Sequence, residues 1–191
     1  MALVALKFVA KMFFMSRIIY AILAICFCLP VFGQTPEKIE SLKKDSEAAK
    51  EAFLKLDRGL SKFFNSAAGY VIFPNVGKGG FGVGGAAGSG ILYEDEKVTG
   101  SAKMTQVTVG FQAGGQAYRE VIFFETEEQL ERFKENKIEM SAQASAVAAA
   151  SGASTDAKYN EGVVIFTMAK KGLMFEASVG GQKFKYSPLE E

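Results

Sequence analysis

The sequence of 191 residues contains no histidine and no tryptophan, and it has two cysteines and four prolines. Without histidine, the chain lacks the usual general base at neutral pH and the commonest metal ligand of proteins. Both cysteines, Cys26 and Cys28, lie in one apolar run near the N-terminus, so the rest of the chain has no thiol for nucleophilic chemistry. The adjacent acids at 94–96 are typical of a solvated turn. These features predict a protein that is not an enzyme and that has no metal or other cofactor.

The charge balance is close to neutral. Lysine and arginine number 22, aspartate and glutamate 21, and apolar residues make up 49% of the chain. This composition is typical of a folded globular domain, and the length fits one such domain. A nucleic-acid-binding domain would need a strongly basic face, so we expect no nucleic-acid partner.

Residues 1–33 predict a secretory signal peptide. The apolar run at residues 18–32 follows Arg17 and precedes the small residue Gly33. It is shorter than the roughly 20 residues that a membrane-spanning helix needs. We expect cleavage between Gly33 and Gln34, which leaves residues 34–191 as one domain. An uncleaved anchor is the alternative.

Cleavage would also change the charge of the chain. The segment before Gln34 contains three basic residues and no acid, so its loss lowers the formal net charge from +1 to −2. Export to the periplasm or the outer cell envelope is the expected localisation. Because residues 1–15 are themselves apolar, Met1, Met12 and Met15 all stay open as the true start.

The exported chain is expected to open with an amphipathic helix. Thr35 is a suitable N-cap, and Pro36 fits the first helical position. Apolar or small residues then recur at spacings of three and four, at Ile39, Leu42, Ser46, Ala49, Phe53, Leu56, Leu60 and Phe63. We expect this stripe to pack on the domain core. A segment that enters a membrane surface, with Phe63 and Phe64 as contacts, is the alternative.

The remainder predicts a β-rich domain with one further helix. Residues 70–73, 97–118 and 120–124 have the pattern of strands, and a helix near 126–136 begins with a capping box of Thr126 and Gln129. The segment at 162–186 predicts a hairpin that turns at residues 169–172. Residues 138–150 suit both a helix and a strand, and the small-residue alternation of the neighbouring segments favours a strand.

A glycine-rich stretch, FPNVGKGGFGVGGAAGSG, occupies residues 73–90. Gly80, Gly82 and Gly85 fit the dinucleotide-binding pattern G-x-G-x-x-G, but no amphipathic helix follows to hold a phosphate, so nucleotide binding is not expected. Glycine inside strands instead marks bends and close backbone approach. We therefore predict a strongly curved antiparallel sheet or small barrel, with Gly82 and Gly84 packed against neighbouring backbone. The structural glycines would be Gly80, Gly82, Gly84, Gly85 and Gly88.

Three motifs resemble the SYLF domain, a lipid-binding family. The first is the glycine-rich stretch together with Gly69, the second is GFQAGGQ at residues 110–116, and the third is KGL at residues 171–173. The first motif matches at Gly69, Ile72, Phe73, Pro74, Val76, Lys78, Gly80, Phe81, Gly82, Gly84, Gly85, Gly88 and Gly90. The three motifs occur in the family's order, and the resemblance covers roughly residues 40–186.

The resemblance implies an α+β fold and the binding of membrane lipid. Eukaryotic members are associated with phosphoinositides, and some with actin. For an exported chain, it implies a module of the cell envelope that binds lipid or a membrane surface. The alternative is a structural domain that binds actin or another protein partner without binding lipid.

Three lysines are candidates for contact with lipid headgroups. Lys78 belongs to the first motif and lies between glycines, while Lys170 and Lys171 lie at the expected hairpin tip. If these loops share one end of the domain, the lysines form a basic edge that would bind anionic phospholipid.

Overall fold

The computed structural model describes residues 36–137, 139–141, 146–148 and 152–189. The chain divides into two units, Met1–Thr35 and Pro36–Glu191, and every described residue lies in the second. The predicted signal peptide, its cleavage site and the Thr35 cap lie outside the described residues.

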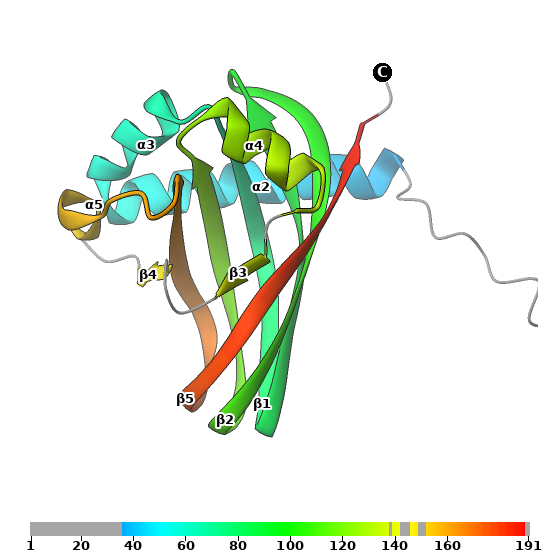
Figure 1. Ribbon diagram of the computed structural model, residues 1–191, viewed down its shortest axis with the longest axis vertical. Helices are drawn as coiled ribbons and strands as arrows, with labels where there is room; N and C mark the ends of the chain where they lie inside the picture. Colours follow the sequence, from blue (N-terminus) through cyan, green and yellow to red (C-terminus); the bar gives the residue numbers. More distant parts are fainter. Residues whose placement is uncertain (1–35, 138, 142–145, 149–151, 190–191) are drawn as a thin grey trace, which may run out of the picture. The chain divides into compact units, whose positions relative to one another are not determined.

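The domain has an α+β fold, as predicted, built on a five-stranded sheet with the order β1-β2-β5-β3 (Figure 1). β4 also pairs with β5, in parallel, whereas the other pairs are antiparallel. The sheet is not closed into a barrel. The elements in chain order are α2 (Pro36–Leu56), η1 (Arg58–Leu60), α3 (Ser61–Ser66), β1 (Gly69–Glu94), β2 (Lys97–Phe124), α4 (Glu127–Lys134), β3 (Glu139–Ser141), β4 (Ala146–Ala148), α5 (Ala153–Asp156) and β5 (Val163–Pro188).

Three strands are unusually long and bend back on themselves. β1, β2 and β5 contain 26, 28 and 26 residues, against about 5–6 for a typical strand. Figure 1 shows each of them running to the lower end of the sheet and returning. In β1 the reversal lies between Gly80 and Gly84, because a Cβ added to Gly80 would stand 2.4 Å from the Cα of Gly84. This bend is the folded end of the sheet.

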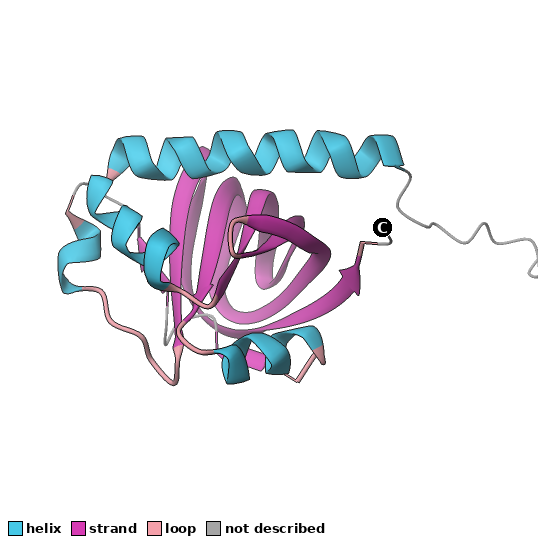
Figure 2. Ribbon diagram, turned by 90° about the horizontal axis from the view of Figure 1, so that it is seen from above, coloured by secondary structure: helices cyan, strands magenta, loops and turns pink. Residues whose placement is uncertain are grey.

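The two halves of each bent strand enclose an apolar interior. Val71, Phe73 and Leu92 of β1 share one buried cluster with Leu130 and Phe133 of α4. We call the side of the strands that bears these residues the inner face. Figure 2 shows α4 and α2 on opposite sides of the curled sheet.

The helices α2, η1 and α3 cover part of the opposite, outer face. Phe53 of α2 and Phe63 of α3 pack there with Tyr70 and Ile72, which alternate along β1 with the inner residues. Aromatic rings are concentrated in this layer, where the centroids of Phe63 and Phe166 lie 5.3 Å apart. The domain thus has two apolar layers, one on each face of the sheet.

The predicted N-terminal helix is present, but its apolar stripe is divided between two helices. α2 buries Ile39, Ser46, Ala49 and Phe53 and ends at Leu56. Asp57 then caps η1, because its side chain accepts a hydrogen bond from the backbone N–H of Gly59. The last positions of the stripe therefore belong to η1 and α3.

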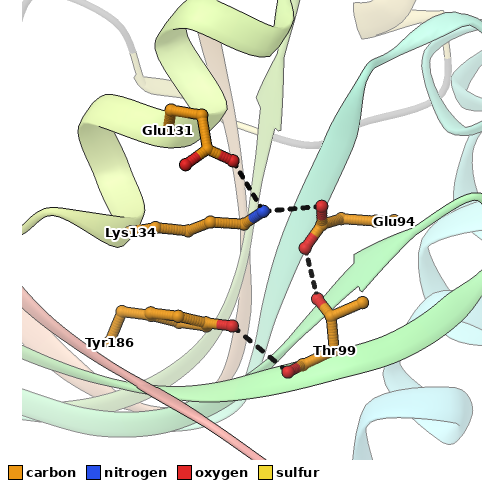
Figure 3. A network of polar contacts seen from close by, with 5 residues as sticks. All are labelled: Glu94, Thr99, Glu131, Lys134 and Tyr186. Atoms are coloured by element: carbon orange, nitrogen blue, oxygen red, sulfur yellow. Dashed lines mark hydrogen bonds and ion pairs between the residues drawn. The ribbon is translucent and has the colours of Figure 1, made fainter.

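The second predicted helix is α4. The hydroxyl oxygen of Thr126 accepts a hydrogen bond from the N–H of Gln129 at 3.4 Å, as the capping box requires. Figure 3 shows how α4 is fixed to the end of the β1–β2 hairpin. The Nζ of Lys134 lies 2.7 Å from a carboxylate oxygen of Glu94 and 2.9 Å from one of Glu131.

The prediction of a hairpin that turns at residues 169–172 is wrong. β5 runs unbroken from Val163 to Pro188 and pairs with β2 along its whole length. Tyr118 pairs with Ala169 and Ala117 with Lys171, so Lys170 is the extra residue of a β-bulge. The local sequence resembles a turn, but β2 offers β5 an unbroken partner on both sides of it.

Other strand predictions need smaller corrections. The expected strands at 97–118 and 120–124 are one strand, β2, and the strand at 70–73 is the start of β1. Pro74 lies at a register shift between Phe73 and Val76 instead of ending the strand. Within residues 138–150, the described parts are the short strands β3 and β4, as the strand interpretation predicts.

Candidate functional site

The predicted basic edge at a hairpin tip is not present. Lys78 follows Val76 by two residues in β1 and so shares the inner face, where it is half-buried. Lys170 is exposed at its bulge, and its Nζ donates a hydrogen bond to the side-chain oxygen of Asn75. Lys171 pairs with Ala117 through its backbone, and its side chain lies outside the described part of the structure. Lys78 and Lys170 therefore do not project from a common loop.

The inner face also carries buried polar side chains. Glu120 is 1% exposed, and the side-chain amide of Gln182 donates a hydrogen bond of 3.1 Å to its carboxylate. Burial raises the pKa of Glu120 to about 7, although the Gln182 hydrogen bond and the charge of Lys78 act in the opposite direction. Across the interior, the hydroxyl of Tyr118 donates to the side-chain oxygen of Gln106 at 3.5 Å. These contacts join the two halves of the bent strands.

The glycines of the first motif serve two different purposes. Cβ atoms added to Gly88 and Gly90 would lie 3.0 Å and 2.5 Å from the carbonyl oxygens of Asn75 and Ile72, so close packing of the two halves of β1 requires glycine there. Gly85 is looser, at 3.4 Å from the Gln106 carbonyl oxygen. The packing predicted for Gly82 is wrong. A Cβ at Gly82 would meet nothing within 4 Å. Glycine is favoured there by its φ of +70°, which other residues rarely adopt.

Four large apolar side chains are exposed at the folded end. Phe81 is 88% exposed, Val83 62%, Val107 64% and Val109 57%. Val83 and Val109 are cross-strand partners, and Val107 pairs with Gly85, so the valines form one continuous surface. We call these four residues the apolar end.

Sequence reasoning missed the apolar end because the usual alternation is inverted in β2. Gln106 and Thr108 are buried on the inner face, whereas Val107 and Val109 point to solvent. A pattern of alternating polar and apolar residues is normally interpreted with the apolar side inward. The available signal was Phe81, an aromatic residue flanked by glycines.

A row of lysines continues the same surface. Ala102 and Met104 are buried in the inner cluster, so Lys103 between them points to the outer face. Lys185 is its cross-strand partner in β5, and Lys183 pairs with Thr105. All three lysines are exposed. We call the surface from Lys103 to Val109, with its β5 partners, the uncovered outer face.

Phe63 and Phe64 do not belong to an exposed surface. They are 4% and 5% exposed and pack in the layer beneath α2. The ring of Phe64 lies edge-on to Phe123, with centroids 4.8 Å apart. Their burial argues against the interpretation that Phe63 and Phe64 contact a membrane, because exposing these side chains would disrupt this core.

A cavity of about 350 Å³ lies between α3 and the β1–β2 turn, and it is lined by Phe64, Asn65, Ala67, Gly69, Tyr70, Tyr93, Asp95 and Glu96. The rings of Tyr70 and Tyr93 stack there with centroids 5.0 Å apart. Within the described residues, no group of three or more His, Cys, Asp or Glu side chains is placed to hold a metal ion. No helix of this part of the chain has the length and apolar character needed to cross a membrane.

Comparison with known proteins finds a family model that matches part of the sheet. Residues 105–187 match the family model Ysc84, described as "Las17-binding protein actin regulator". Residues 105–187 are therefore similar to part of a SYLF domain. The resemblance stated from the motifs is thereby confirmed, and the SYLF match covers most of β2, α4 and β3 to β5.

A curated relative adds a second similarity. "Beta cell expansion factor A" from Aeromonas veronii is 34% identical over 71 residues, which are 37% of this chain. The matched segment spans 27% of the relative's length. The similarity is therefore confined to about a quarter of that protein.

Proposed function

We propose that this protein binds membrane surfaces and that the apolar end of its sheet makes the contact. The observation that carries the proposal is the exposure of Phe81, Val83, Val107 and Val109 at the folded end, where the three valines are neighbours in the sheet. Contiguous exposed apolar residues on a soluble domain mark sites of contact with membranes or protein partners. The SYLF family is linked to both lipid and actin binding, which supports a binding module.

A lipid surface accounts for the residue types better than a catalytic site does. The apolar end has no nucleophile, and the buried carboxyl of Glu120 faces Gln182 in the interior. Valine and phenylalanine side chains gain about 1.5–3 kcal/mol each when they leave water for an apolar phase. Insertion of the apolar end to the depth of the headgroup boundary would therefore give measurable binding.

Vesicle co-sedimentation tests the proposal. We expect the exported chain to pellet with phospholipid vesicles, and we expect Phe81→Ser with Val109→Ser to weaken binding at least tenfold, since about 1.4 kcal/mol corresponds to a factor of ten. Leu56→Ser is the matched control, because Leu56 is also exposed, at 37%, but lies on α2. All variants should keep the parent's melting temperature.

Two results would contradict the proposal. One is a parent chain that stays in the supernatant with every vesicle composition. The other is a double variant that binds vesicles like the Leu56 control. Binding to actin filaments in place of vesicles would favour the alternative of a protein-binding domain, which the description of the matched family supports.

We further infer that the chain is exported to the cell envelope. The basic residues, apolar run and small Gly33 of residues 1–33 support this localisation. N-terminal sequencing of the exported protein should begin at Gln34. Recovery of the intact apolar N-terminus in the membrane fraction would show an uncleaved anchor instead.

A further inference from the structure

The lysine row and the apolar end lie on one surface but at different distances from the folded end. Lys103 precedes Val109 by six residues of the same strand. At about 3.3 Å per residue, the two positions are separated by roughly 20 Å. The orientation of the strands relative to a membrane therefore decides whether both groups can contact it.

An upright domain would use the apolar end alone. If the strands stood perpendicular to the membrane, Lys103 would lie roughly 20 Å above an inserted Val109, while an interfacial segment enters only about 5–10 Å. A lysine in that position would not reach the lipid phosphates. If the uncovered outer face lay along the membrane, the valines and the lysines would reach it together.

The lysine arrangement is unfavourable without an anion. Lys103 and Lys185 are direct cross-strand partners on the exposed side of the sheet, and like charges in such positions destabilise a sheet. Among the described residues, neither has an acidic partner within ion-pair distance. Glu139 pairs with Lys183 through its backbone, so the argument is based on Lys103 and Lys185.

We propose that the domain lies with its uncovered outer face along the membrane, where Lys103 and Lys185 bind the phosphates of anionic phospholipids. Phe81, Val83, Val107 and Val109 then enter the boundary of the apolar phase. This inference rests on the proposed function and adds the orientation and the headgroup class. The lysines provide attraction to anionic lipid, and the apolar end provides insertion.

A lipid surface fits this face better than a protein does. The face is the outer side of a sheet that bends back on itself, so it is convex, and the cavity described above lies elsewhere. Protein interfaces depend on close shape complementarity, which a fluid lipid surface does not require. A second copy docked on this face would also add a second pair of lysines to the first.

Site-specific labels test the orientation. An environment-sensitive fluorophore is attached to single cysteines at Thr105→Cys, Val83→Cys and Glu128→Cys, with Cys26 and Cys28 replaced by serine. Thr105 is exposed midway along the face, Val83 is at the apolar end, and Glu128 is exposed on α4. With vesicles of phosphatidylcholine and 30% phosphatidylglycerol, we expect the labels at 105 and 83 to leave water and the label at 128 to stay exposed.

Charge reversal tests the lysines. Lys103→Glu with Lys185→Glu should weaken binding to the phosphatidylglycerol vesicles at least tenfold. Lys44→Glu with Lys55→Glu is the matched control, since both lysines are exposed on α2 and the change in net charge is the same. The control should bind within about threefold of the parent.

The outcomes separate this inference from the proposed function. A shielded label at 83 with a water-exposed label at 105 would show an upright domain, which overturns the inference and leaves the proposed function intact. Equal binding by the two charge-reversed variants would also overturn it. If no label responds to any vesicle, the proposed function itself fails. A response of the labels to actin filaments and not to vesicles would also contradict the proposed function.

Discussion

Lys78 and Glu120 are two residues of opposite charge on the inner side of the sheet. The lysine of the glycine-rich motif faces the interior, and its charge acts on the buried carboxyl of Glu120. A buried carboxylate is costly unless it is paired and hydrogen-bonded. Lys78 and Gln182 therefore explain how Glu120 is tolerated in a core that α4 otherwise fills with apolar groups.

Glu120 should make the stability of the domain depend on pH. Burial raises its pKa from the ordinary 4.5 to about 7. Between these values the folded state binds more protons than the unfolded state, so the free energy of unfolding falls as pH rises through this window. Glu120→Gln cannot ionise and keeps an oxygen for Gln182. We expect it to be more stable than the parent at pH 8, by on the order of 2–3 kcal/mol.

Thermal unfolding of both proteins at pH 5 and pH 8 measures this difference. At pH 5 the two melting temperatures should lie close together, because Glu120 is then protonated in the folded state. Parallel curves, with the same offset at both pH values, would show that the Glu120 carboxyl does not titrate in this range.

The burial of single residues was harder to predict from the sequence than the helices or the fold class. The sequence of β2 does not show that Gln106 is inside and Val107 outside, because alternation gives two faces without saying which is buried. Likewise, the stripe that ends at Phe63 does not distinguish a core contact from a membrane contact. Only the packing of α3 on Phe123 and Phe166 decides it.

At the level of elements, local signals predicted the helices well and the strands less well. Thr126 marks a helix start through short-range chemistry, and α4 begins where this residue predicts. The bend of β1 and the bulge at Lys170 depend on pairing with residues of β2 that are not their neighbours in sequence. Such register effects leave no local pattern beyond the glycines themselves.

Asp57 should be essential for the junction of η1 with α5. One carboxylate oxygen accepts from the N–H of Gly59 at 3.0 Å, and the other accepts from the N–H of Ser154 at 2.7 Å. Asp57→Ala would remove the cap and leave a buried donor unsatisfied. We expect a loss of about 1–3 kcal/mol in the free energy of unfolding, measured by urea denaturation.

Asp57→Asn is the control for this prediction, because its amide oxygen can replace one of the two acceptors. It should lose less stability than Asp57→Ala. Although burial alone would raise the pKa of Asp57, the hydrogen bonds from Ser154 and Gly59 hold it below its usual value. The parent should therefore have a larger free energy of unfolding than Asp57→Asn near neutral pH, and this difference should diminish as pH falls below about 4. Equal stability of parent and Asp57→Ala would refute the capping role.

At the scale of the whole molecule, the fold class was predictable and the path of the strands was not. Composition and motif order indicate a glycine-rich α+β domain, and the match of residues 105–187 to the SYLF family agrees. The sequence does not reveal that three strands bend together, because the contacts that hold the halves of a strand together join residues that lie far apart along it. The apolar end and the lysine row emerge only from this bending and from the register of β2 with β5.

Net charge and local charge make opposite predictions for membrane binding. Without residues 1–33, the formal net charge is −2, so an anionic vesicle should repel the molecule if net charge decided binding. The exposed lysines at 103 and 185 instead present a positive surface beside the apolar end. Lowering the salt from 150 to 10 mM extends the screening length from about 8 Å to about 30 Å and strengthens both effects.

We expect the local effect to dominate, because the lysines approach the phosphates closely whereas the surplus acids are spread over the domain. Binding of the chain without residues 1–33 to vesicles with 30% phosphatidylglycerol should therefore tighten several-fold at 10 mM salt, as co-sedimentation can measure. Pure phosphatidylcholine vesicles are the control, and their binding should change little with salt. Weaker binding to the anionic vesicles at low salt would show that net charge outweighs the lysine row, and the contact would then depend on the apolar end alone.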